Sequence, residues 1–377
     1  MIYVNEPQFS GNEKKYLNEC IDSGWVSSGG PFVKRFESKF SSYIGRKHGI
    51  AVCNGTAALE VALYAANIKQ GDEVIVPAFT IVSCILAILR IGATPVLVDI
   101  EPEMWAIDVN LIESKITTKT KAIMPVHIYG HPVDMDPILE ISDKYGLIVI
   151  EDSAEVHGAE YKGKKCGALG HISTFSFYAN KLLTTGEGGM VLTDNDFMAE
   201  RALSYRNLCF DKDMRFSHTD LGFNYRMTNL QAAVGVAQLE RIDEIVLFKR
   251  KMGRYYQEKT SNIPGIRFQS EKKWAKTVYW MYCIELSPDL NIDANMLAKH
   301  LKTEGIESRP FFKGMHMQKP FNDLGLFLGE VYKNTDYAYK YGLYLPSGMT
   351  LTYDQIDFIC DTICDILALH EKNNTVL

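Results

Sequence analysis

The chain has 377 residues, of which 46% are hydrophobic and 23% charged, and its formal net charge is -6. This length accommodates two or three domains, or one large α/β unit with an appendage. Proteins that bind the phosphate backbone of nucleic acids need a basic excess, which this composition lacks, so we expect no nucleic-acid partner. A small anionic ligand stays possible, because a few backbone amides and one arginine can hold a phosphate in an acidic protein.

No segment has the pattern of a signal peptide or of a membrane span. Residues 1–15 lack a basic stretch followed by an apolar one, and the best apolar run, residues 84–98, is interrupted by an arginine, a glycine and a proline. The eight cysteines include no CxxC pair and are typical of reduced core thiols, so we expect a cytoplasmic protein. Cys360 and Cys364 have a spacing that a metal or redox pair could use, but core packing is favoured and no metal site is expected.

Helical and strand patterns alternate through the first two thirds of the sequence. This alternation predicts an α/β fold with a mainly parallel sheet and helices on both faces. Ligands of such sheets bind beyond the carboxyl ends of the strands. We expect strands at residues 50–53, 73–76, 95–98, 122–126 and 147–150, and helices at 56–66, 83–90 and 137–145.

The last third has a different character. Residues 228–260 form one long helical pattern, whose basic residues 249–251 are typical of a solvated helix face, although a basic binding patch is the alternative. We place the domain boundary within this pattern, which gives a large domain of residues 1–245 and a small C-terminal α+β domain of residues 246–377. The small domain is expected to contain a strand at 278–284 and helices at 294–304 and 353–370.

Two strand ends carry polar groups that suit a bound ligand. Asp152 follows the strand at 147–150, where a carboxylate can pair with a buried cation, although a helix N-cap is the simpler interpretation. Gly55 and Thr56 follow the strand at 50–53 and begin a helix. Their backbone amides can hold a phosphate at the helix start, although a plain turn has the same sequence.

Lys181 lies between an aromatic run, residues 175–178, and a glycine-rich turn, residues 185–189. Apolar surroundings lower the pKa of a lysine, and only a deprotonated amine attacks an aldehyde. The turn lacks the GK[ST] of a nucleotide-binding loop, so its glycines are expected to allow close backbone approach behind the lysine. This pattern favours a Schiff base between Lys181 and pyridoxal 5'-phosphate (PLP), with an ordinary solvated lysine as the alternative.

Four motifs follow one another in the order NGT, EDSAE, FSFYANK and TGEGG, at residues 54–56, 151–155, 175–181 and 185–189. This order resembles the DegT/DnrJ/EryC1/StrS family of sugar aminotransferases. The resemblance extends from GWVSSGGPFVKRFE at residues 24–37 to ESRPFF at residues 307–312. It implies a PLP-dependent enzyme of fold type I, similar to aspartate aminotransferase, with a mainly parallel seven-stranded sheet in the large domain.

The resemblance also implies the roles of the residues around the cofactor. Lys181 would bind PLP covalently and then carry the proton between cofactor and substrate, while Asp152 would bind the pyridinium nitrogen. Gly55, Thr56 and Ser176 would hold the phosphate. Family members that dehydrate their sugar have a histidine in place of this lysine, so Lys181 favours transamination.

Further residues are assigned around this centre by the same resemblance. Asn224 would reach the phosphate in the partner subunit's site, which implies a homodimer with shared active sites, and Glu155 would lie near the cofactor hydroxyl or the sugar. Ile81 stands where many relatives have an aromatic residue over the cofactor ring, and aliphatic contact differs from stacking by only about 1 kcal/mol. The expected substrate-binding residues are Ser27, Ser28, His157, Arg226 and Arg309.

The implied reaction transfers the amino group of L-glutamate to the 4-keto carbon of a nucleotide-linked 4-keto-6-deoxy sugar. GDP-4-keto-6-deoxymannose is the expected substrate, and O-antigen or other surface polysaccharide assembly the expected pathway. The alternatives are the same chemistry on dTDP- or UDP-linked 4-keto-6-deoxyglucose, transfer at a 3-keto position, a PLP dehydratase or amino-acid aminotransferase, and a binding or regulatory protein that kept the fold without turnover.

Overall fold

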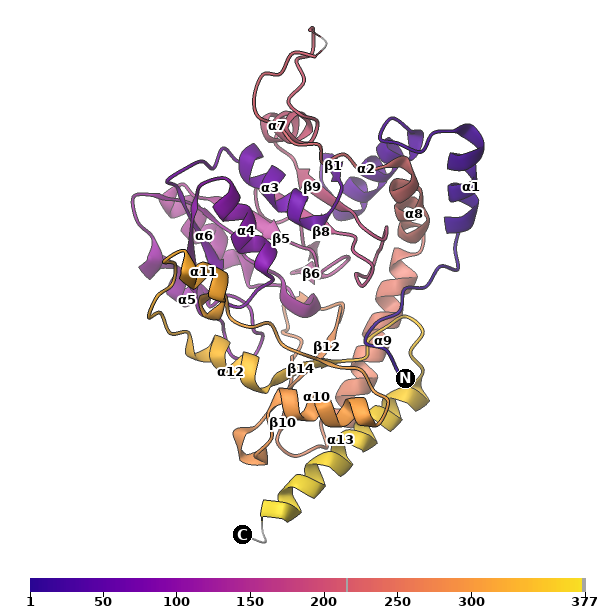
Figure 1. The fold of residues 1–377 in the computed structure, drawn as a ribbon, viewed down its shortest axis with the longest axis vertical. Helices are drawn as coiled ribbons and strands as arrows, with labels where there is room; N and C mark the ends of the chain where they lie inside the picture. The colour runs from indigo at the N-terminus through magenta and orange to yellow at the C-terminus, as the bar shows by residue number, and fades with distance from the viewer. Residues whose placement is uncertain (215, 375–377) are drawn as a thin grey trace.

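A computed structural model of the chain describes residues 1–214 and 216–374 (Figure 1). The view shows a sheet surrounded by helices, from which the long helix α9 (Ile242–Thr260) runs to a second group of elements near the C-terminus. Among the described residues, no helix combines the length and the apolar character needed to cross a membrane.

The main sheet has seven strands in the order β1-β9-β8-β5-β4-β2-β3. All its pairings are parallel except those of β9, which runs antiparallel to both β1 and β8. The central strands are buried on both faces, as their unbroken apolar sequences require. The strands are β1 (His48–Val52), β2 (Glu73–Pro77), β3 (Thr94–Val98), β4 (Thr120–Ile123), β5 (Ile148–Asp152), β8 (Ile172–Ser176) and β9 (Gly189–Thr193).

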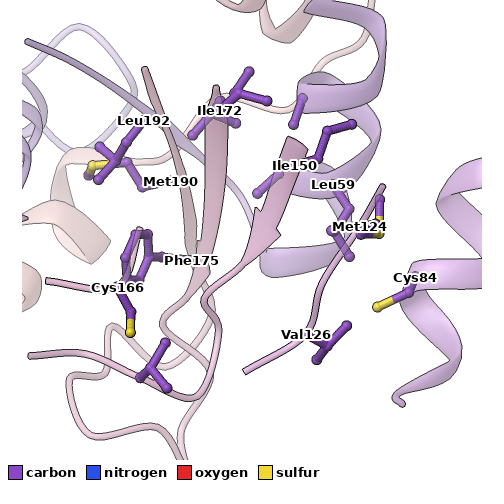
Figure 2. Close-up of a cluster of buried hydrophobic side chains, with 14 of the residues drawn as sticks. Leu59, Cys84, Met124, Val126, Ile150, Cys166, Ile172, Phe175, Met190 and Leu192 are labelled. Carbon is purple, nitrogen blue, oxygen red and sulfur yellow. The ribbon is translucent and has the colours of Figure 1, made fainter. Parts of the chain in front are cut away.

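Helices cover both faces of this sheet. Helix α3 packs against β8 and β9 and also contacts α4 and α7, while α8 contacts α1 and α2. Figure 2 shows side chains from α3, such as Leu59, near Ile150 of β5 and Ile172 of β8. These helices are α1 (Glu13–Ser23), α2 (Pro31–Ile44), α3 (Gly55–Ala65), α4 (Val82–Arg90), α6 (Met135–Tyr145), α7 (Asp196–Arg206) and α8 (Asn229–Leu239).

The single helix expected at residues 228–260 is two helices, so that prediction is wrong. Helix α8 begins with a capping box between Thr228 and Gln231, and α9 starts at Ile242 after a break at Glu240 and Arg241. The expectation of a solvated basic face also needs correction. Lys249 is only 4% exposed, because α9 buries this side of its surface against the C-terminal elements.

The C-terminal elements form a smaller antiparallel sheet in the order β10-β12-β14-β13, with helices packed on it. Its side chains make a second hydrophobic cluster, which begins within α9 at Met252. The N-terminal segment also reaches this part of the molecule, because Ile2 pairs with Ile306. Its elements are β10 (Ile266–Phe268), β12 (Tyr282–Leu286), β13 (Arg309–Pro310), β14 (Gly342–Leu345), α10 (Ala294–Thr303), α12 (Lys333–Tyr341) and α13 (Tyr353–Asn374).

Short elements complete the described chain. They include a small three-stranded sheet in the order β11-β6-β7. Their bounds are β6 (Glu160–Tyr161), β7 (Lys164–Lys165), β11 (Ala275–Lys276), α5 (Val109–Ile112), α11 (Lys319–Asp323) and the 3-10 turns Glu113–Lys115, Ile128–Gly130, Pro288–Leu290 and Met315–Met317. Within residues 1–214 and 216–374, no group of three or more His, Cys, Asp or Glu side chains is arranged to hold a metal ion.

Candidate active site

A cavity of about 500 Å³ lies at the carboxyl ends of strands β5 and β8, the edge at which parallel sheets bind their ligands. Its walls come from the start of α3, the start of α4, the ends of both strands and the segment that carries Lys181. Seven of the predicted site residues line it together, namely Gly55, Thr56, Ile81, Asp152, Glu155, Ser176 and Lys181.

The start of α3 forms one end of the cavity. Asn54 caps the helix by accepting a hydrogen bond from the backbone N–H of Ala57 at 2.8 Å. A Cβ atom at Gly55 would lie 2.8 Å from Cβ of Ser176, so only glycine allows the helix start to approach the strand this closely. The Thr56 hydroxyl donates to Ser83 at 2.9 Å. The backbone amides at the helix start and the nearby hydroxyl groups make this end suitable for a phosphate.

Asp152 ends strand β5 and is 3% exposed. Its Oδ1 accepts a hydrogen bond from the backbone N–H of Ala154 at 3.1 Å, and its Oδ2 accepts one from Sγ of Cys84 at 3.2 Å. The carboxylate is therefore held from both sides in the wall of the cavity. Such a buried carboxylate suits a cationic partner on a ligand.

Lys181 projects between a carboxylate and an aromatic ring. Its Nζ lies 3.3 Å from Oε1 of Glu155 and 3.8 Å from the ring centroid of Trp280. Glu155 also accepts a hydrogen bond from the backbone N–H of Tyr129 at 2.7 Å. Burial raises the pKa of Glu155, while the charge of Lys181 opposes this shift. The amine is thus fixed in direction and shielded from water on two sides.

Aromatic side chains also line the walls, and the sequence analysis did not identify Tyr225, Trp280 or Tyr344 among them. Trp280 precedes β12, and its indole N–H donates to the carbonyl oxygen of Asn180 at 2.8 Å. Lys249 donates to the carbonyl oxygens of Trp280, at 2.8 Å, and of Ser347. No motif marks Trp280 or Lys249. The wall aromatics are Phe175, Tyr178, Tyr225, Trp280, Phe312 and Tyr344.

His157, predicted to bind substrate, does not line the cavity, which corrects that expectation. It is fully buried among the rings of Phe40, Phe175 and Phe177, with centroid distances of 5.4 to 6.2 Å. Neither ring nitrogen has a hydrogen-bond partner of normal geometry. Burial and then the charge of Lys181 lower the pKa of His157 to about 3, so the imidazole is neutral at physiological pH.

The other predicted substrate residues lie outside the cavity of this chain. The carbonyl oxygen of Ser27 accepts from the backbone N–H of Asn229 at 3.0 Å, and Ser28 follows it in the loop before α2. Arg309 on β13 is exposed, pairs with Glu307 and lies opposite Tyr344 of the cavity wall.

Asn224 and Arg226 also lie away from this chain's cavity. Asn224 is exposed, and Arg226 donates to Oδ1 of Asn207 at 2.7 Å. Between them, Tyr225 turns inward and donates to Glu60 at 2.8 Å in the cavity wall. The alternation places Asn224 on the outer side of this segment.

Family models, curated proteins and solved structures all match this chain to aminotransferases or sugar-nucleotide synthases. Residues 7–364 match the model of the DegT/DnrJ/EryC1/StrS aminotransferase family. A GDP-perosamine synthase of Caulobacter vibrioides is 42% identical, over 97% of this chain and 98% of the relative, and a GDP-perosamine synthase of Vibrio cholerae is 42% identical over 96% and 98%. The X-ray structure of S. venezuelae DesV is 31% identical with a TM-score of 0.88, and the match covers 94% of each chain.

The fold and these matches define a PLP-dependent aminotransferase of fold type I. The chain belongs to the DegT/DnrJ/EryC1/StrS aminotransferase family. The predicted α/β fold with its mainly parallel seven-stranded sheet is confirmed. The cavity fits PLP, because the start of α3 at Gly55 suits the phosphate, Asp152 suits the ring nitrogen and Lys181 offers an amine to the aldehyde.

Proposed function

We propose that this enzyme transfers the amino group of L-glutamate to C4 of GDP-4-keto-6-deoxymannose, which yields 2-oxoglutarate and GDP-perosamine. The observation that carries the proposal is the joint position of Lys181 and Asp152 in one cavity. The two GDP-perosamine synthases that match almost the whole chain favour this substrate over dTDP- or UDP-linked 4-keto-6-deoxyglucose and over a 3-keto sugar.

Different residues of the chain would serve different steps of this transfer. Bound PLP would act as an electron sink that makes the proton on the substrate carbon acidic. Lys181 would take up this proton and return it, and Glu155, 3.3 Å from Nζ, would steady the ammonium form. Asp152 would keep the ring nitrogen protonated, and the start of α3 would anchor the phosphate. The aromatic wall would exclude water from the reacting carbon.

We further propose that the active unit is a homodimer, in which Asn224 reaches the phosphate in the partner's cavity and Arg226 lies close by. The support is the outward position of Asn224, together with exposed apolar side chains on the same segment, Met214 (65%) and Leu221 (88%). The eight free cysteines support the proposal of a cytoplasmic location.

The test is the visible absorption spectrum of the PLP-loaded protein during two additions. L-Glutamate should remove the band of the bound cofactor, and GDP-4-keto-6-deoxymannose should restore it after excess glutamate has been removed, with an amino sugar detected by mass spectrometry. Loss without return would reject the GDP sugar as substrate, and dTDP- and UDP-linked sugars would be titrated next. A protein that stays colourless with added PLP would refute the enzyme function.

A further inference from the structure

A buried thiol contacts the carboxylate that faces the ligand cavity. Cys84 on α4 has no exposed surface, and its Sγ lies 3.2 Å from Oδ2 of Asp152. We propose that Cys84 is a positioning residue, whose S–H donates to Asp152 and so sets the orientation of this carboxylate. The inference rests on the proposed role of Asp152 as the partner of the PLP ring nitrogen.

In the contact between Cys84 and Asp152, the thiol is the hydrogen-bond donor. Ionised Asp152 is an acceptor only, so a hydrogen bond between the two side chains requires an S–H donor. Burial, and then the charge of Asp152, raise the pKa of the Cys84 thiol well above its usual value, which keeps it protonated. The hydroxyl of Thr80, also fully buried, lies 3.3 Å from Sγ and is placed to donate to the sulfur. The three groups therefore form a chain of donors that ends on Asp152.

The two donors to Asp152 act on different oxygens. The backbone N–H of Ala154 occupies one site on Oδ1, and Cys84 occupies one site on Oδ2. This fixes the plane of the carboxylate and leaves acceptor capacity on both oxygens for a group in the cavity. Because a thiol is a weaker donor than a hydroxyl, it orients the carboxylate while withdrawing little of its negative charge.

The contact also links two walls of the cavity. Cys84 lies in the first turn of α4, whose N-cap is Ile81, and Ile81 lines the cavity beside Asp152. The position of Cys84 therefore couples the residue expected to cover the cofactor ring to the residue expected to bind its nitrogen. A substitution at position 84 should therefore change the affinity for PLP more than the affinity for the sugar nucleotide.

Three substitutions separate the donor role from packing. Cys84→Ala removes the donor and leaves space, Cys84→Val removes the donor and fills the space, and Cys84→Ser keeps a donor of similar size. The PLP dissociation constant is measured for each by equilibrium dialysis, and the pH dependence of the bound cofactor's absorption is recorded. We expect Ala and Val to weaken PLP binding roughly fivefold to tenfold, and Ser to remain within about twofold of the unmodified protein. The Ser variant should also shift the absorption titration of the bound cofactor, because a hydroxyl is a stronger hydrogen-bond donor to Asp152 than a thiol.

A double-mutant cycle with Asp152→Asn completes the test. If Cys84 acts through Asp152, Cys84→Ala should have little further effect on PLP binding in the Asp152→Asn protein. Full binding by the Val variant, binding by the Ser variant as weak as that of Ala, or additive effects in the cycle would each overturn the proposal. No sugar nucleotide enters these assays, so a wrong substrate assignment leaves the result intact. Absence of PLP binding by the unmodified protein would refute both proposals.

Discussion

The amine of Lys181 is held by a carboxylate and an indole ring. We expect Lys181→Ala to lower turnover by at least about 10⁴-fold, because the proton carrier is lost, while pyridoxamine phosphate still binds. The measurements are steady-state rates and a titration with pyridoxamine phosphate. The exposed Lys276 offers a matched control, and Lys276→Ala should leave both unchanged. Appreciable turnover by Lys181→Ala would disprove the role assigned to this lysine.

His157 makes stability depend on pH in a defined direction. Its pKa is about 3 in the folded protein and near 6.5 in the unfolded chain, so the unfolded state binds more protons between these values. Stability therefore falls as the pH drops through 6.5 toward 3. In His157→Leu, the loss of unfolding free energy between pH 7 and pH 5 should be smaller by about 2 kcal/mol.

Urea unfolding at the two pH values measures this difference. The exposed His218 provides the control, since His218→Gln removes an imidazole from the surface. An equal loss of stability in His157→Leu and in the unmodified protein would show that His157 does not titrate on unfolding as described.

At the scale of elements, the junction between β9 and α3 depends on one close approach. A Cβ at Gly189 would lie 2.4 Å from the carbonyl oxygen of Asn54, the cap of α3. We expect Gly189→Ala to lower the free energy of unfolding by about 2 kcal/mol. It should also weaken PLP binding, because the start of α3, which is expected to hold the phosphate, must shift. Urea unfolding and a PLP titration check this.

Gly11→Ala is the matched control for this substitution, because its new Cβ would meet only flexible side-chain atoms of Arg241 and Glu13. It should change stability by less than about 0.5 kcal/mol. Equal effects of the two substitutions would mean that the close contact between Gly189 and Asn54 does not constrain the start of α3.

The same elements show what the sequence predicts and where prediction fails. The strand expected at 147–150 is present at Ile148–Asp152, because apolar runs and helix starts are local signals. The break between α8 and α9 is missed, since the helical periodicity continues across it and only packing separates them: α8 lies on α1 and α2, whereas α9 lies on α13.

The site divides in the same way. Lys181, Asp152 and Gly55 stand next to strand ends and turns, so the sequence indicates them. Trp280 and Tyr344 come from the C-terminal part of the chain and enter the cavity through tertiary packing, which no local pattern encodes. The proposed domain division between residues 245 and 246 falls within α9, and it too depends on packing that no local pattern encodes.

At the scale of the whole molecule, Lys249 joins the C-terminal elements to the active-site wall. Burial lowers its pKa to about 7, from 10.5 in the unfolded chain. Between these values the unfolded state holds the extra proton, so stability rises with pH. We expect Lys249 to add about 2 kcal/mol to the free energy of unfolding between pH 7 and pH 9. Lys249→Met should abolish that gain.

Chemical unfolding at pH 7 and pH 9 measures this gain. The adjacent, exposed Lys251 provides the control, and Lys251→Met should keep the rise. A Lys249→Met protein whose stability still rises like that of the unmodified protein would exclude Lys249 as the source.

The proposed shared sites predict complementation between defective subunits. Lys181→Ala and Asn224→Asp should each be inactive at limiting PLP, the second because a carboxylate would face the phosphate. Their co-expression should restore about a quarter of the sites, since half the dimers are mixed and each contains one intact site. Activity of the co-purified mixture is the measurement.

Co-expression of Lys181→Ala with Asp152→Ala is the control. Both residues line the cavity of one chain, so the mixture should stay inactive if each site takes them from the same subunit. Absence of recovery with Asn224→Asp would argue that each subunit builds its site alone.

Trp280 has an optical consequence. Its indole ring lies against Nζ of Lys181, so its emission is sensitive to any chromophore attached at that atom. Trp25 is 55% exposed, whereas Trp280 is 3% exposed and anchored at both its indole N–H and its carbonyl oxygen. The chain therefore contains its own fluorescent reporter of cofactor loading, and because Trp280 also precedes β12, this reporter is attached to the C-terminal sheet.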